Sequence, residues 1–256
     1  MHPGTGLNHS VFRFYQELND FLPQQQRGQS RVYSYTGHPS VKDAIEAQGV
    51  PHTEVDLVIV DGAAGAGVSV DFDYQMVDGD RVAVYPVFES LDITGTSLLR
   101  PAPLRETRFV VDVHLGKLAR LLRLMGFDTY YANDLTDAEI AMRSKVGHRI
   151  VLTRDQGLLK RSIIDHGYWV RSQNSEAQAV EVVRRFDLAL NVHPFTRCPA
   201  CNGTLVEVAA DKVADAVPQR SRAAVSFAEC DGCGKIYWPG SHRPRIVATI
   251  RRILGG

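Results

Sequence analysis

Two cysteine pairs constrain the fold of this chain more than any other feature. All four cysteines lie in "CPAC", Cys198 and Cys201, and in "CDGC", Cys230 and Cys233. Two C-x-x-C pairs that 28 residues separate are typical of a tetrahedral thiolate zinc site, whereas a single pair could be a redox dithiol. Because four protein ligands close the coordination sphere, we predict a structural zinc ion in a zinc ribbon with a basic tail over residues 191–256.

Upstream of the cysteines, residues 108–190 alternate four times between strand-like and helix-like patterns. Two of the helices begin at capping-box spacings, Thr136 with Glu139 and Ser175 with Gln178. Such alternation indicates an α/β domain, in which a parallel sheet carries flanking helices and its chemistry lies beyond the C-terminal ends of the strands. The expected strands are "FVVDV", "FDTYY", "RIVLT" and "YWVRS", and a helix over "QGLLKRSII" follows the third.

The front of the chain, residues 1–90, has a different pattern, ββαββ. The expected helix begins at Pro39 and Ser40 and ends at Gly49, and two strands, "VDLVIVDG" and "DGDRVAVYPVF", follow it. One helix laid across a mixed sheet is a β-grasp fold, which we predict for this segment. Residues 91–107 contain prolines and a glycine without clear periodicity, so we expect a linker there.

Charge divides the chain in the same way as these patterns. Residues 1–90 hold 5 Lys and Arg against 12 Asp and Glu, whereas residues 91–256 hold 24 against 17. This asymmetry favours separate domains, the second suited to a polyanion, although chance segregation of solvated charge would look the same. No apolar run reaches the length of a membrane span, and the first residues lack the features of a secretion signal. We therefore expect a cytoplasmic protein with reduced cysteines and no membrane partner.

Aspartates follow the strands of the predicted parallel sheet. Asp112 ends the first strand, Asp155 comes just past the third, and Asp134 lies in the loop after the second. Carboxylates that converge on one sheet edge repel one another and favour a hard cation such as Mg²⁺ or Mn²⁺, which supports hydrolysis of phosphodiesters. Each aspartate alone could instead be a helix cap or a turn residue. Glu139 is a fourth, weaker candidate, because the capping box also needs it.

Basic residues follow the first of these aspartates along a predicted helix. Lys117, Arg120 and Arg123 recur at steps of three beside the apolar face, where they could bind the phosphates of a polyanion or form a solvated face. Arg154, next to Asp155, could contact substrate or pair with an acid.

A second basic region follows the last cysteine pair, where aromatic and basic residues alternate. These residues could guide a single-stranded nucleic acid, or the tryptophan could pack the small core of the ribbon. They are Tyr237, Trp238, His242, Arg243 and Arg245.

Four of these stretches together resemble a known family. In order along the chain, "DVHLGKLARLLRLMGFD", "LTRDQGLL", "RCPACNG" and "CDGCGKIYWPGSH" are similar to the Mut-seven C-terminal RNase family, over about residues 108–240. The resemblance implies a PIN-like nuclease fold followed by a zinc ribbon, often behind a ubiquitin-like domain. It also implies a metal-dependent ribonuclease, with Asp112 and Asp155 as the acids matched most plainly.

The front segment carries a resemblance of its own. "PSVKDAIEAQGVPHTEVDLVIVDG" and "VDGDRVAVYPVFES" resemble the ubiquitin-like sulfur-carrier proteins, whose last strand runs out into an exposed Gly-Gly. At the matching point this chain reads "PVFES" and continues, so we expect docking of a protein partner or regulation in place of carrier chemistry.

Two functions follow from the sequence as hypotheses. The first is a Mg²⁺- or Mn²⁺-dependent endoribonuclease that uses Asp112, Asp134 and Asp155, with Glu139 as a further ligand. The second is a non-catalytic RNA- or ribosome-associated binding module on the same PIN-like scaffold. A sulfur-transfer adaptor is disfavoured because the internal Gly-Gly is missing.

Overall fold

A computed structural model describes most of the chain and divides it into two compact units. The first unit contains Met1–Arg105 together with Gln156–Tyr168, and the second contains Glu106–Asp155 with Trp169–Gly256. The first unit therefore takes in a short segment from the middle of the chain. Most of the predicted linker lies outside the described residues, which are 6–61, 67–86, 96–99, 107–213, 216–219, 224 and 226–255.

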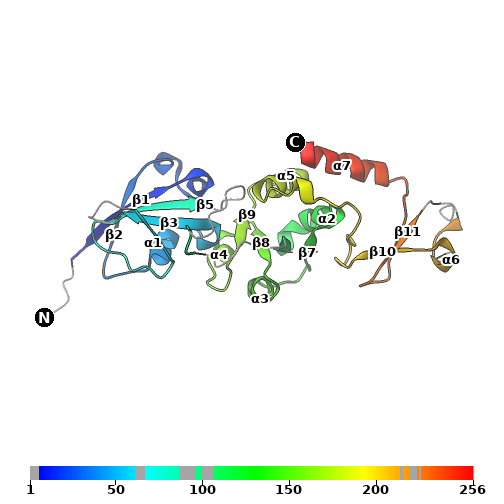
Figure 1. The fold of residues 1–256 in the computed structure, drawn as a ribbon, viewed down its shortest axis with the longest axis horizontal. Coiled ribbons are helices and arrows are strands. Elements are labelled where there is room, and N and C mark those ends of the chain that lie inside the picture. The colour runs from blue at the N-terminus through cyan, green and yellow to red at the C-terminus, as the bar shows by residue number, and fades with distance from the viewer. Residues whose placement is uncertain are drawn as a thin grey trace. The chain divides into compact units, whose positions relative to one another are not determined.

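The first unit is built on a five-stranded mixed sheet (Figure 1). Strand β1 pairs in parallel with β5, and the other pairings are antiparallel. Helix α1 accompanies the sheet, which confirms the predicted β-grasp fold. In sheet order the strands are β2 (Arg31–Tyr35), β1 (Asn8–Phe14), β5 (Arg81–Pro86), β3 (Val55–Asp61) and β4 (Val68–Val70), and α1 spans Val41–Ala47.

The core of this unit follows from alternation along the strands. Phe12 and Phe14 of β1 point to the same side and are buried with Val84 of β5 and Ile45 of α1, which removes a large apolar area from water. The helix begins where the sequence predicts, because the Ser40 hydroxyl oxygen accepts a hydrogen bond from the Asp43 N–H at 3.1 Å.

The second unit contains the predicted parallel sheet. Strand β6 pairs in parallel with both β7 and β8, so the chain order reverses between β6 and β8. Helices α2 and α5 contact each other, whereas α3 contacts β6 and β8 and is drawn on the opposite side of the strands (Figure 1). The sheet order is β7 (Asp128–Tyr130), β6 (Arg108–Val111), β8 (Ile150–Thr153) and β9 (Gly167–Trp169), and the helices are α2 (Gly116–Leu124), α3 (Asp137–Gly147) and α5 (Ser175–Arg185).

Two details of the predicted helices differ in the structure. The helix expected over residues 156–164 is only α4 (Gln156–Leu159), after which the chain turns. The capping box expected at Ser175 is wrong by one residue: the Asn174 side chain caps α5 by accepting from the N–H groups of Glu176 and Ala177. The capping box at Thr136 is confirmed.

The cysteine region forms a small antiparallel sheet. Strands β10 (Leu205–Val208), β11 (Phe227–Cys230) and β12 (Ile236–Tyr237) pair in that order. A short helix, α6 (Ala210–Val213), contributes to the core beneath them. Trp238 packs against this core, as one of the two interpretations of the sequence predicts.

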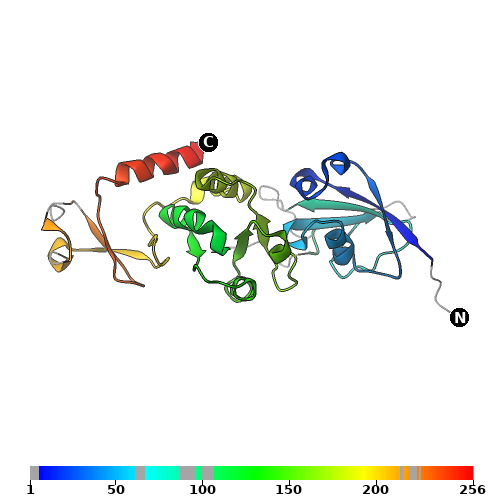
Figure 2. The same cartoon turned by 180° about the vertical axis from the view of Figure 1, so that it is seen from behind.

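The last helix, α7 (Arg243–Gly255), packs against α5 of the same unit (Figures 1 and 2). Ile250 and Ile253 are buried, and Arg252 forms an ion pair with Glu176 of α5 at 2.9 Å. The basic tail is therefore part of the folded unit. None of the helices in the described residues is long and apolar enough to cross a membrane.

Candidate functional site

The four cysteines converge on one point. Their ligand sulfurs all lie within 4.8 Å of one another, and the pairs Cys198–Cys233 and Cys201–Cys230 are 3.8 and 3.3 Å apart. A tetrahedral zinc ion with Zn–S bonds of about 2.3 Å places its sulfurs about 3.8 Å apart. The quartet can therefore hold a metal ion, and its geometry and donor atoms fit zinc.

Backbone hydrogen bonds and a glycine fold the first cysteine pair into a knuckle. The Cys198 N–H donates to Gly203 O at 2.8 Å, and the Gly203 N–H donates to the Cys201 sulfur at 3.4 Å. A Cβ on Gly203 would lie 2.7 Å from the Cys230 sulfur. Only glycine fits there without displacing a ligand, which gives a steric reason for the "CNG" sequence.

The pKa values of the Cys198 and Cys201 thiols are shifted in opposite directions. Burial alone would raise the pKa of Cys198, but hydrogen bonds from the Tyr237 hydroxyl, at 3.1 Å, and from the backbone outweigh it and lower the pKa to about 6. Burial raises the pKa of Cys201 to about 12, and its hydrogen bonds with neighbouring thiols add to the shift. The cluster thus favours a thiolate at Cys198, which is the charge state that binds a metal cation.

Asp112 and Asp155 lie at the same edge of the parallel sheet. The Asp112 N–H donates to Leu152 O at 3.0 Å, which continues the ladder between β6 and β8. The Thr153 hydroxyl donates to Asp112 Oδ2 at 2.5 Å, and its oxygen accepts from the Asp155 N–H at 2.9 Å. Thr153 is wholly buried, so it fixes both aspartates at the point where the chain order of the sheet reverses, the usual ligand position in such sheets.

The other two predicted acids do not join them. Asp134 is exposed in the turn between β7 and α3. The Glu139 carboxylate accepts from the Thr136 N–H and hydroxyl, both at 2.8 Å, and these bonds lower its pKa. Within the described ranges, only the cysteine quartet brings three or more metal-ligating side chains together. Glu139 thus has the capping role that the sequence left open.

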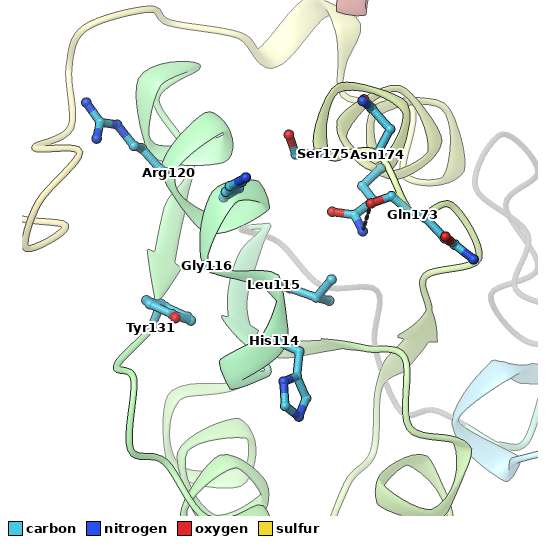
Figure 3. Close-up of a pocket in the computed structure, with 10 residues that line it drawn as sticks. His114, Leu115, Gly116, Arg120, Tyr131, Gln173, Asn174 and Ser175 are labelled. Atoms are coloured by element: carbon cyan, nitrogen blue, oxygen red, sulfur yellow. Dashed lines mark hydrogen bonds between the residues drawn. The ribbon is translucent and has the colours of Figure 1, made fainter.

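Two basic residues of α2 line a pocket next to this edge. Lys117 and Arg120 are exposed on α2 and line a cavity of about 690 Å³ together with His114, Tyr131 and Asn174. Figure 3 shows that α2 and the start of α5 flank this pocket. His114 lies two residues after Asp112, and its N–H donates to Asp112 Oδ1 at 3.2 Å. The cavity thus begins directly beside the aspartate edge.

Arg120 also lines a second and larger cavity, which lies between α2, the ribbon and α7. Its volume is about 1010 Å³, and Phe195, Trp238, His242 and Arg243 contribute to its walls. The Arg243 guanidinium lies over the Phe195 ring, 4.8 Å from its centroid. Arg120 therefore connects a cationic pocket at the sheet edge with a groove of aromatic and basic side chains.

Two family models match this chain and together cover most of it. The model of the Mut7-C RNAse domain matches residues 107–250, more than half of the chain, and that of Mut7-C ubiquitin matches residues 8–92. The chain belongs to the Mut7-C RNase family. Comparison with curated proteins and with solved structures returns no match. The Mut7-C RNase match begins at β6 and includes the cysteine quartet, so the ribbon is part of the RNase domain.

The predicted basic stripe on α2 is wrong for Arg123. Its side chain is only 4 % exposed, and burial lowers the pKa of its guanidinium. The guanidinium donates to Thr129 O at 2.8 Å and to Ala200 O at 3.0 Å, with longer contacts to the carbonyls of Tyr131 and Pro199. Arg123 therefore joins the first cysteine knuckle to the α/β core and is not exposed to solvent. Arg154, in contrast, is exposed, as a substrate contact requires.

Asp128 and Asn202 form a second connection between ribbon and core, which the sequence reading missed. The Asn202 amide donates to Asp128 Oδ1 at 2.7 Å, and its oxygen accepts from the Thr129 N–H at 2.8 Å. Arg149 pairs with the same carboxylate at 2.7 Å. Burial would raise the pKa of Asp128, but the hydrogen bonds from Arg149 and Asn202 outweigh it and lower the pKa. Only the asparagine in "CNG" could have signalled this role.

Proposed function

We propose that this protein is a metal-dependent endoribonuclease whose reaction takes place at the edge formed by Asp112 and Asp155. The supporting observation is the Thr153 bridge, which fixes both aspartates at the reversal point of the sheet in a chain of the Mut7-C RNase family. Thr153 thus holds the Asp112 carboxylate and the backbone of Asp155, and supporting hydrogen bonds of this kind orient acidic residues at metal sites.

The donor set fits a hard divalent cation. Asp112 and Asp155 offer carboxylate oxygens at this edge of the sheet. These residues would hold Mg²⁺ or Mn²⁺, which supplies a more acidic bound water and neutralises charge on the phosphate. Two carboxylates at the edge provide fewer ligands than the four acids that the sequence predicts. The smaller ligand set also fits the alternative function, a non-catalytic RNA-binding module.

The protein's own cations would orient the RNA. Lys117 and Arg120 are exposed in the pocket that begins beside Asp112, and Arg154 is exposed next to Asp155. Arginine and lysine at these positions can hold the phosphates on either side of the scissile bond. From Arg120 the strand would continue into the ribbon groove, whose walls combine aromatic and basic side chains, a lining that suits a single strand.

Zinc would act structurally in this scheme. Four thiolates leave no open coordination position, and the knuckle holds the α/β core through Arg123 and Asn202. We therefore assign the zinc to the ribbon and the hydrolysis to the aspartate edge. A cytoplasmic location stays a prediction.

The test is cleavage of labelled single-stranded RNA by the full chain in Mg²⁺ or Mn²⁺. Asp112→Asn and Asp155→Asn should abolish cleavage, and Thr153→Val should lower it about 10- to 100-fold, because a lost supporting hydrogen bond typically has that effect. Asp211→Asn, an exposed acid on α6, is the matched control. Cleavage that survives both aspartate substitutions would place the reaction elsewhere, whereas RNA binding by the unmodified chain without any cleavage would support the binding module.

A further inference from the structure

The Mut7-C ubiquitin domain contacts a segment that the RNase match includes. Gln156–Tyr168 lies within residues 107–250 but belongs to the same compact unit as the ubiquitin domain. In the chain this segment begins immediately after Asp155. It consists of the four-residue helix α4 and a turn that leads to β9.

The contacts come from a 3-10 turn between α1 and β3, His52–Glu54. The hydroxyl of Thr53, a fully buried residue, donates to Leu159 O at 3.2 Å. His52 is 4 % exposed, and its Nε2 lies 2.9 Å from Ile164 O. In the other direction, Lys160 Nζ donates to Glu46 O at 3.0 Å.

These hydrogen bonds satisfy carbonyl groups in the buried backbone of the segment. The Leu159 and Ile164 side chains are fully buried, and a buried carbonyl without a partner costs about as much free energy as a lost hydrogen bond. The partners come from the side chains of the ubiquitin domain. Packing is also close, because a Cβ on Gly167 would lie 2.4 Å from Leu159 Cδ2 and 3.4 Å from Thr53 Cβ.

The ring of His52 is held on both sides. Its Nδ1 lies 2.6 Å from Glu46 Oε1, and the Phe72 ring stands edge-on to it at 5.7 Å. Each ring nitrogen of His52 therefore faces an oxygen, Glu46 Oε1 on one side and Ile164 O on the other. The ring thus connects α1 to the 156–168 segment.

We propose that the ubiquitin domain acts in cis as a clamp on residues 156–168, and that His52 and Thr53 are positioning residues for Asp155. The turn at His52–Glu54 therefore has its binding partner within the same chain, in the part that the RNase match covers. Sulfur carriers, in contrast, act through a free C-terminal tail. The clamp itself stands on the contacts, whereas its effect on catalysis rests on the proposed ribonuclease function.

Hydrogen exchange of the full chain tests the clamp without any assay of activity. Thr53→Val keeps the shape of the side chain and removes its donor, so amides of residues 156–168 should exchange about tenfold faster, with β6 and α2 unchanged. His52→Ala should have the same local effect, and Thr53→Ser should restore protection. His38→Ala is the matched control, because its ring contacts Met76 O within the domain at 3.2 Å and should not affect the segment.

RNA cleavage by the same variants tests the effect on Asp155. The turnover number should fall in Thr53→Val and recover in Thr53→Ser, while KM stays constant because Lys117 and Arg120 are untouched. Exchange in residues 156–168 that Thr53→Val and His52→Ala leave unaltered would overturn the clamp, even in an active enzyme. Faster exchange in a chain that never cleaves RNA would support the clamp and refute the ribonuclease.

Discussion

Arg123→Met tests whether Arg123 connects the cysteine knuckle to the α/β core, as the structure shows, or binds RNA, as the sequence predicts. Methionine has a similar length and no charge, so it can fill the buried channel without donating hydrogen bonds. The substitution leaves the carbonyls of Thr129 and Ala200 without their donor. Because one of these carbonyls belongs to the α/β core and the other to the cysteine knuckle, the loss should weaken the connection between them.

The magnitude follows from the two short bonds. A hydrogen bond from a charged donor contributes about 1.5–3 kcal/mol, so two contribute about 3–6 kcal/mol. A buried methionine recovers about 1–3 kcal/mol of this, because no charge has to be desolvated. We expect a net loss of about 2–3 kcal/mol, which for a unit of this size lowers Tm by about 4–12 °C.

Thermal unfolding with zinc present, together with the rate of zinc transfer to a colorimetric chelator, measures the effect. Arg123→Met should lower Tm and speed zinc release, with little effect on RNA affinity at a temperature where the variant is folded. Arg120→Met is the matched control on the same helix: exposed in the pocket, it should leave Tm unchanged and weaken RNA binding. The reasoning is refuted if Arg123→Met keeps the Tm and zinc retention of the parent chain but loses RNA affinity.

Two further predictions concern the ribbon and its attachment. Cys230→Ser removes one of four sulfur ligands, so zinc content measured by atomic absorption should fall well below one per chain and amides of β10 and β11 should lose protection; full zinc content would contradict the quartet. Asp128 has a folded-state pKa below its usual range, so its contribution to stability is present above the unfolded pKa and is lost as pH falls through the folded value, below about 3.8. Tm measured from pH 5 to pH 2 should therefore fall more steeply for the parent chain than for Asp128→Asn, and parallel curves would show that the ion pair contributes nothing; zinc loss in acid affects both proteins and cancels in the comparison.

The sequence predicts those parts of the fold that depend on local pattern. Paired cysteines at knuckle spacing define the ribbon because few other arrangements satisfy four thiolates. Strand and helix alternation defines the parallel sheet, and the position of Asp112 and Asp155 at strand ends then follows from topology. The structure adds Thr153, whose bridging hydroxyl gives no periodic signal because a buried threonine also fits an ordinary strand.

What the sequence could not reveal depends on contacts between distant segments. The steps of three that unite Lys117, Arg120 and Arg123 fix an angular position on α2 but not what covers it. The cysteine knuckle covers Arg123, the last of the three, although the knuckle begins at Cys198, 75 residues further along the chain. Similarly, nothing local in "VPHTEVD" indicates that His52 and Thr53 bond to a segment more than 100 residues away.

The burial of Arg123 limits where the RNA of the proposed function could lie on the RNase domain. With only Lys117 and Arg120 facing solvent, the cationic face of α2 is confined to its first half, the half that follows Asp112 in the chain. In the proposed function, a strand bound there would have its phosphates near the aspartate edge at the start of α2, and Arg120 would direct its continuation toward the groove lined by Phe195 and Trp238. The knuckle that buries Arg123 also forms part of that groove through Pro199. Zinc binding should therefore affect RNA affinity indirectly, through the shape of the groove and not through a contact of the metal with RNA.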